Sequence, residues 1–121
     1  MDMGDFAGGL LKYLREHPVA RVTIGGGFGK ITKLAQGAMD LHSGRSQVDF
    51  EWLAKFAPEN LRGEVSTANT AQQVLELLGP NLAQHVAMEA KEQVVKVLRG
   101  SLAAADVMII DRGGRIIAHA A

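Results

Sequence analysis

A glycine-rich segment followed by two lysines contains the residues of this sequence best suited to binding a charged group. Residues 23–33 read Thr-Ile-Gly-Gly-Gly-Phe-Gly-Lys-Ile-Thr-Lys, and we expect a turn there made by Gly25, Gly26, Gly27 and Gly29. Glycines let backbone N–H groups approach a ligand closely, and the start of a helix leaves N–H groups unpaired and partially positive. Lys30 and Lys33, one helical turn apart, add full charges. The segment therefore predicts a site for a carboxylate or a phosphate.

The same segment does not match the common nucleotide-binding motifs. A P-loop would need glycine at Ile24 and Ser or Thr at Ile31. A dinucleotide-binding fingerprint that began at Gly25 would need glycine at Lys30. We therefore reject an ATPase and an NAD-binding protein. A tight strand-to-helix turn without any ligand remains the alternative interpretation of the glycines.

A polar loop over residues 38–46 carries the second group of candidate residues. It holds an acid, an imidazole, a hydroxyl and a guanidinium, at Asp40, His42, Ser43 and Arg45. Arg45 is able to hold a carboxylate bidentately, and His42 suits acid–base chemistry or hydrogen-bond donation. The alternative is a solvated loop that only caps the next helix. Elsewhere the histidines lack the spacing of metal ligands, so we expect no metal site.

The elements that position these residues follow from hydrophobic periodicity and from breaker residues. We expect helices over 6–17, 30–36, 50–56, 71–78 and 82–100, strands over 20–25, 107–110 and 116–118, and a loop over 59–66. Capping patterns at Ser46/Asp49 and Thr70/Gln73 precede two of these helices. Residues 111–114, Asp-Arg-Gly-Gly, favour a hairpin between the last two strands.

This order predicts an α/β fold with a small mixed sheet. Its strands are parallel except for an antiparallel hairpin at the carboxyl end, and about five helices pack on it. Residues 1–121 then form a single α/β domain. Three strands make a thin sheet with vulnerable edges, so we expect this domain to be part of a larger three-layer domain in a longer protein.

Composition restricts the function further. Thirteen basic residues balance thirteen acidic ones, which argues against binding nucleic acid or a membrane surface. The chain has no cysteine, and therefore no thiolate nucleophile and no disulfide, which fits a cytoplasmic protein. No apolar run has the length of a membrane span, and the first residues do not read as a signal peptide.

Three segments of the chain resemble the carboxyl-terminal half of CbiD proteins. They are Met3-Gly4-Asp5-Phe6, Ile24-Gly25-Gly26-Gly27-Phe28-Gly29-Lys30-Ile31-Thr32-Lys33-Leu34-Ala35-Gln36-Gly37, and Leu41-His42-Ser43. The resemblance implies transfer of a methyl group from S-adenosylmethionine to C1 of cobalt-precorrin-5B in anaerobic cobalamin biosynthesis. It also implies an amino-terminal domain of the same protein as a partner. One departure is Leu41, where many members have threonine before His-Ser.

The resemblance also suggests roles for the candidate residues. The glycine turn, Lys30 and Asp5 would bind S-adenosylmethionine, and His42 and Asp40 would act in catalysis. Lys33, Ser43 and Arg45 would face the acidic corrinoid. Two alternatives stay open, namely a non-catalytic module that binds a phosphate or a nucleotide, and a structural domain whose glycines serve only packing. Homo-oligomerisation is compatible with each of them.

Overall fold

The computed structural model describes residues 6–17, 20–37, 48–98 and 104–121. The helices are α1 (Phe6–Glu16), α2 (Phe28–Ala35), α3 (Phe50–Ala54), α4 (Arg62–Ser66), α5 (Ala71–Leu78) and α6 (Pro80–Val97), with a short 3₁₀ helix η1 (Glu59–Leu61). The strands are β1 (Arg21–Gly26), β2 (Ala104–Ile110) and β3 (Ile116–Ala120). The expected order of helices and strands is therefore confirmed, apart from the additions described below.

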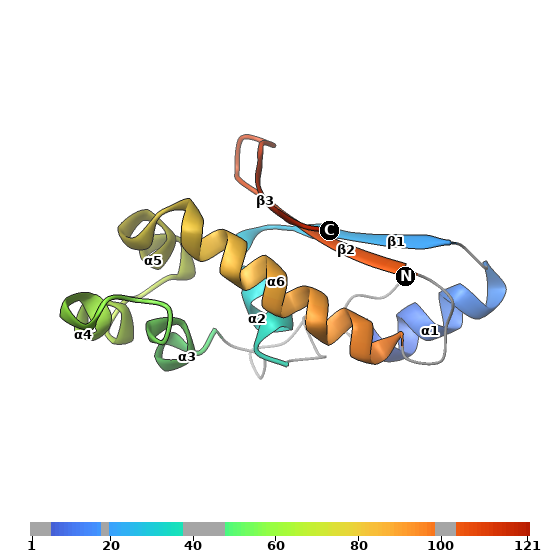
Figure 1. Cartoon of the computed structure of the whole chain (residues 1–121), viewed down its shortest axis with the longest axis horizontal. Helices are drawn as coiled ribbons and strands as arrows, with labels where there is room; N and C mark the ends of the chain where they lie inside the picture. Colours follow the sequence, from blue (N-terminus) through green and yellow to red (C-terminus); the bar gives the residue numbers. More distant parts are fainter. Residues whose placement is uncertain (1–5, 18–19, 38–47, 99–103) are drawn as a thin grey trace.

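The three strands form one mixed sheet in the order β1-β2-β3. β1 runs parallel to β2, with Arg21 opposite Ala104 and Gly26 opposite Ile109, whereas β3 runs antiparallel to β2. The helices α2 and α6 pack on one face of this sheet, and no described helix covers the other face (Figure 1). This arrangement confirms the predicted small α/β domain and leaves one sheet face open in the described part of the chain.

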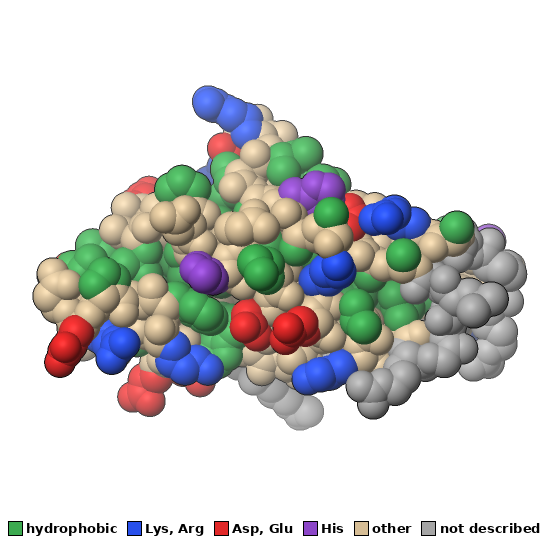
Figure 2. Space-filling view, in the orientation of Figure 1, with side chains coloured by type: hydrophobic (Ala, Val, Ile, Leu, Met, Phe, Trp, Pro, Cys, Tyr) green, Lys and Arg blue, Asp and Glu red, His purple; other side chains and the backbone are tan. Residues whose placement is uncertain are grey.

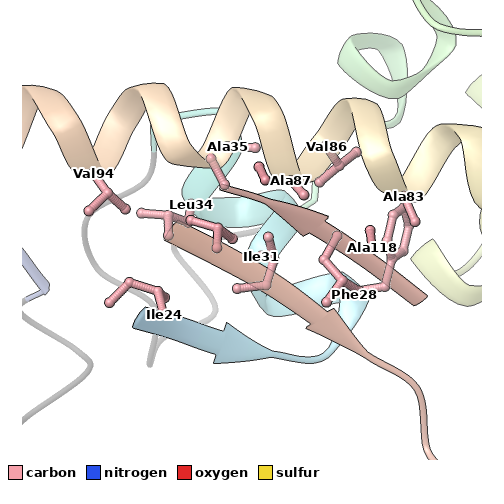
Figure 3. Close-up of a cluster of buried hydrophobic side chains, with 14 of the residues drawn as sticks. Ile24, Phe28, Ile31, Leu34, Ala35, Ala83, Val86, Ala87, Val94 and Ala118 are labelled. Carbon is pink, nitrogen blue, oxygen red and sulfur yellow. The ribbon is translucent and has the colours of Figure 1, made fainter. Parts of the chain in front are cut away.

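The core lies between the sheet and the helices α2 and α6. Figure 3 shows Ile24 of β1 beneath side chains from both helices, among them Ile31, Leu34 and Val94. Leu34 and Val94 are fully buried. Burying a side chain of this size contributes about 1.5–3 kcal/mol relative to leaving it exposed. Packing at this interface therefore fixes where α2 begins relative to the end of β1.

The loop predicted over residues 59–66 is wrong, because this segment folds into η1 and α4. Val65 is fully buried and anchors α4, and Arg62 Nε donates a hydrogen bond to the Ala57 carbonyl. A single buried side chain produces no helical periodicity, so the pattern of the sequence does not reveal so short a helix. The strand predicted over 107–110 is likewise longer, since β2 begins at Ala104.

The caps of two helices refine the predicted patterns. Asp49, and not Ser46, is the N-cap of α3, and its carboxylate accepts hydrogen bonds from the amides of Glu51 and Trp52. The apolar face of that helix begins at Phe50, and Asp is as good an N-cap as Ser. Ser46 itself lies outside the described residues. Thr70 caps α5 as predicted by accepting from the amide of Gln73.

The two edges of the sheet differ. The backbone of His119 in β3 is bound by the side-chain amide of Gln84 from α6, with Nε2 donating to the His119 carbonyl at 3.0 Å and Oε1 accepting from its N–H at 3.2 Å. Gln84 therefore satisfies backbone groups that an edge strand otherwise leaves unpaired. β1 forms the opposite edge and pairs only with β2 among the described residues.

Candidate functional site

The glycine segment does not form a glycine turn. Gly25 and Gly26 are the last residues of β1, Gly27 is the N-cap of α2, and Gly29 lies inside the helix. The helix begins at Phe28 instead of Lys30. None of these glycines has a positive φ, and Gly27 is extended with φ −70° and ψ 164°. The strand therefore runs into the helix through a single residue, and the backbone conformation alone does not require glycine there.

Gly27 and Gly29 open onto a hollow at the carboxyl ends of the parallel strands. A Cβ atom added at either position would meet no other atom within 4 Å. The hollow has a volume of about 310 Å³ and is also lined by the start of α5 and by the β2–β3 hairpin. Ligands of open α/β sheets favour the carboxyl ends of the strands. The lack of side chains at these two positions therefore leaves space beside the backbone that none of the described residues fills.

Two helix N-termini and one guanidinium surround this hollow. Phe28 begins α2 and Ala71 begins α5, and both residues line it. The first amides of a helix have no intrahelical partner and carry partial positive charge. In the part of the chain that the structure describes, no side chain caps α2, and the Thr70 hydroxyl accepts only from the third residue of α5. Arg112, an exposed hairpin residue, adds a full positive charge at the rim.

One acid also lines the hollow. Asp111 accepts hydrogen bonds from the amides of Gly113 and Arg115, both at 2.9 Å, so its carboxylate is bound within the hairpin turn. Gly114, with φ 84°, completes this turn. The carboxylate therefore serves the hairpin, while the helix amides and Arg112 remain available to an anion. The chemistry of the hollow suits a carboxylate or a phosphate group.

The predicted lysines lie apart from the hollow. Lys30 is exposed on the first turn of α2 but is not among the residues that line it. Lys33 is half-buried in the last turn of α2, at the opposite end of the helix from the glycines. The remaining predicted site residues, Asp5, Asp40, His42, Ser43 and Arg45, lie outside the described residues. Of the predicted set, the structure brings Gly27 and Gly29 together with Arg112, which the sequence analysis did not select.

A second polar cluster lies on the open face of the sheet, away from the helices. Thr23 Oγ1 of β1 donates to Asp106 Oδ1 of β2 at 2.7 Å, and His119 Nε2 of β3 lies 2.6 Å from Asp106 Oδ2. Arg21 Nη1 lies 3.6 Å from the same carboxylate. Asp106 is 5% exposed. One buried carboxylate therefore joins all three strands.

Hydrogen bonding keeps Asp106 ionised. The hydrogen bond from Thr23 and then that from His119 lower the pKa of this carboxyl below its ordinary value of 3.8. Burial acts in the opposite direction, and the charges of His119 and Arg21 lower the pKa further. An ionised carboxylate can only accept, so His119 Nε2 carries the proton of this hydrogen bond. In the neutral form of the ring, the other nitrogen, Nδ1, is then the acceptor.

Sequence reasoning missed this cluster, although one signal was present. Asp106 is the only charged residue in the apolar run Ala-Ala-Asp-Val-Met-Ile-Ile of β2. A charge within a strand needs a partner, but the partners depend on register. The structure pairs Thr23 with Asp106 and Met108 with His119, and neither pairing follows from the sequence alone.

A larger groove of about 610 Å³ runs between α6 and the end of β3. Met88 and Val95 of α6 are about half exposed along it, and Lys91 and Glu92 add charges of both signs. Figure 2 shows these kinds of side chain mixed over the exposed face of α6. His119 also lines the groove, and its side chain is 45% exposed. The imidazole is therefore accessible from outside the molecule.

Neither a metal-binding cluster nor a membrane-spanning helix is found among the residues that the structure describes. No group of three or more His, Cys, Asp or Glu side chains there has an arrangement that would hold a metal ion. None of the described helices is both long enough and apolar enough to cross a membrane.

Comparison with known proteins finds one matching family and a group of relatives that share one name. Residues 40–121 match the family described as "CbiD, C-terminal domain". A Brucella anthropi relative named cobalt-precorrin-5B C(1)-methyltransferase is 54% identical over 98% of this chain and 34% of its own length. Relatives of the same name from Brucella ovis and Brucella canis are each 51% identical with the same coverage.

The chain therefore belongs to the CbiD family, through its C-terminal domain. It spans about a third of the length of the curated relatives that it matches. No solved structure matches it.

Proposed function

We propose that this chain is the carboxyl-terminal part of a cytoplasmic cobalt-precorrin-5B C1-methyltransferase. The enzyme would transfer the methyl group of S-adenosylmethionine to C1 of the corrinoid in anaerobic cobalamin biosynthesis. The relatives that share about half of the residues carry this name. The structural observation that supports the proposal best is the hollow lined by Gly27 and Gly29, where the helices α2 and α5 begin.

The chemistry of the hollow fits the methionine carboxylate of S-adenosylmethionine. The first amides of α2 would bind this carboxylate, and Arg112 would supply the balancing charge. The absence of a Cβ atom at Gly27 and Gly29 is the feature that allows such a close approach. Lys30, on the exposed side of the same first turn, would add to the positive potential without direct contact.

Methyl transfer from a sulfonium needs the carbon nucleophile and the methyl group to be held in line, and it needs no protein nucleophile. Proximity and orientation of this kind supply as much as about 7–11 kcal/mol of a barrier. The role of the domain is therefore to bind and orient. Asp5 would accept hydrogen bonds from the donor, while Lys33, Ser43 and Arg45 would face the acidic corrinoid. His42 and Asp40 remain our predicted catalytic pair.

The rest of the longer protein would complete the site. Since the chain spans about a third of its relatives, we infer that the amino-terminal part packs against the open sheet face and the free edge of β1. Ligand sites occur preferentially between domains. The hollow has room for part of a ligand only, so the donor and the corrinoid would meet at this junction.

Calorimetry and a methylation assay test the proposal. The full-length protein should bind S-adenosylmethionine and should transfer isotopically labelled methyl to cobalt-precorrin-5B, and Arg112→Ala should weaken binding of the donor. The alternative of a non-catalytic phosphate-binding module predicts binding of inorganic phosphate with no methyl transfer. Full-length protein that neither binds the donor nor methylates the corrinoid would refute the proposed function.

A further inference from the structure

His119 is held through both its side chain and its backbone. Its Nε2 is bound by Asp106 at 2.6 Å, and its backbone N–H and carbonyl are both bound by Gln84. Asp106 is in turn oriented by the Thr23 hydroxyl at 2.7 Å. The Asp106 carboxylate therefore orients the imidazole ring, and Gln84 holds the backbone that carries it.

This arrangement also fixes which ring nitrogen is free. Because the ionised carboxylate of Asp106 accepts from Nε2, the neutral ring carries its lone pair on Nδ1. The side chain is 45% exposed, and it borders the groove between α6 and β3. An imidazole with a fixed tautomer and an accessible lone pair is the arrangement that a general base requires.

His119 lies in the same row of the sheet as the glycine segment. Gly25 and His119 are the two neighbours of Met108 across the sheet, one on β1 and one on β3. Two strand spacings separate them, which is about 10 Å. Residues directly opposite on neighbouring strands point to the same side, so both lie on the open face. The hollow begins two residues beyond Gly25, at Gly27, so a ligand of macrocycle size is needed to reach from the hollow to His119.

We propose that His119 is the proton acceptor of the methylation, with Asp106, Thr23 and Gln84 as positioning residues. The inference rests on the proposed function. The methyl group of the donor is attached to a cationic sulfur. An electron pair of the corrinoid forms the new C–C bond to this methyl group, and the electrons of the broken C–S bond stay on sulfur. The corrinoid gains one positive charge in this step. Transfer of a proton from a conjugated N–H or C–H of the corrinoid to His119 Nδ1 then returns the corrinoid to its original charge.

Imidazole rescue in the full-length protein tests the role of His119. His119→Ala should lower kcat by about 100-fold or more, the contribution expected of a general base, with binding of S-adenosylmethionine unchanged. Added imidazole should restore part of the rate. His85→Ala is the matched control, because His85 is an exposed histidine of α6 that stacks on Phe56, and this variant should keep the wild-type rate.

A spectroscopic measurement on this chain tests the positioning residues without any reaction. Nitrogen-15 spectra of the neutral His119 ring should show protonated Nε2 and unprotonated Nδ1. Asp106→Asn should produce a mixture of both tautomers, and His85 should not change. This readout does not depend on the methylation assay, and a mixed tautomer in the wild-type chain would overturn the geometry.

The outcomes separate this inference from the proposed function. If wild-type protein methylates the corrinoid and His119→Ala does so at the same rate, the role of His119 is refuted and the function stands. A slow His119→Ala variant that imidazole does not rescue also refutes it, because the residue is then only structural. Wild-type protein that shows no methyl transfer refutes the proposed function itself.

Discussion

Replacing Gly29 by alanine should make the protein more stable and should weaken binding of the methyl donor at the site that we propose. The position is helical, its φ is not positive, and an added Cβ would meet no atom within 4 Å. Gly→Ala at such a site stabilises by about 0.4–1 kcal/mol, chiefly because the unfolded chain loses freedom. With 121 residues and about 2.1 cal/mol/K of unfolding entropy per residue, Tm should rise by about 2–4 °C.

The same methyl group should hinder an anion. It would project into the hollow where a carboxylate approaches the first amides of α2. Losing one hydrogen bond to a charged group costs about 1.5–3 kcal/mol, which corresponds to a roughly 10- to 100-fold weaker Kd. Thermal unfolding of this chain measures the first effect, and calorimetric titration of the full-length protein with S-adenosylmethionine measures the second.

Gly63 offers a matched control. It is the second residue of α4, as Gly29 is of α2, and a Cβ there would also meet nothing within 4 Å. Gly63→Ala should raise Tm similarly and leave the Kd for S-adenosylmethionine unchanged. If Gly29→Ala raises Tm as Gly63→Ala does but binds the donor as tightly as wild type, the hollow beside Gly29 is not the donor site.

Three further substitutions test the fold that supports the site. Leu34→Ala, at a fully buried position, should lower the free energy of unfolding by about 2–5 kcal/mol in urea titrations, and a loss below 1 kcal/mol would contradict the packing described. Gln84→Ala should cost about 1–2 kcal/mol and promote aggregation through the exposed edge of β3, which light scattering detects; unchanged scattering would argue against edge protection. The hydrogen bonds to Asp106 lower the pKa of its carboxyl in the folded state below the value of 3.8 in the unfolded chain. They therefore stabilise the fold at pH above 3.8, and this stabilisation is lost as the pH falls through the lower pKa of the folded state. The urea midpoints of wild type and Asp106→Asn should therefore converge as pH is lowered from neutral through this range, whereas a constant difference would contradict the assignment.

The sequence was sufficient to predict much of the fold because breakers and periodicity mark its elements. Gly79 and Pro80 separate α5 from α6, and Asp111 to Gly114 mark the hairpin. Periodic apolar residues identify α6 as one long helix. These signals are local, and each depends on a few neighbouring residues. The short helix α4 was missed because one buried side chain, Val65, produces no period.

The candidate site was only partly predictable, because its parts come from distant segments. The glycines mark the correct end of β1. Because there are several of them, the sequence predicts a glycine turn, whereas the strand and the helix are joined through Gly27 alone. The approach of α5 and Arg112 depends on tertiary packing, which no local pattern encodes. The cluster around Asp106 likewise depends on the parallel register of β1 with β2.

We expect an anionic group of the methyl donor to bind where the glycines at the end of β1 meet the start of α2. Amide shifts of this chain, and of the same residues labelled within the full-length protein, during titration with S-adenosylmethionine test it most directly. We predict shifts concentrated at Gly27, Gly29 and Lys30, with Ala71 and Arg112 across the hollow. Saturable binding of the donor to the full-length protein with none of these signals moving would contradict the account.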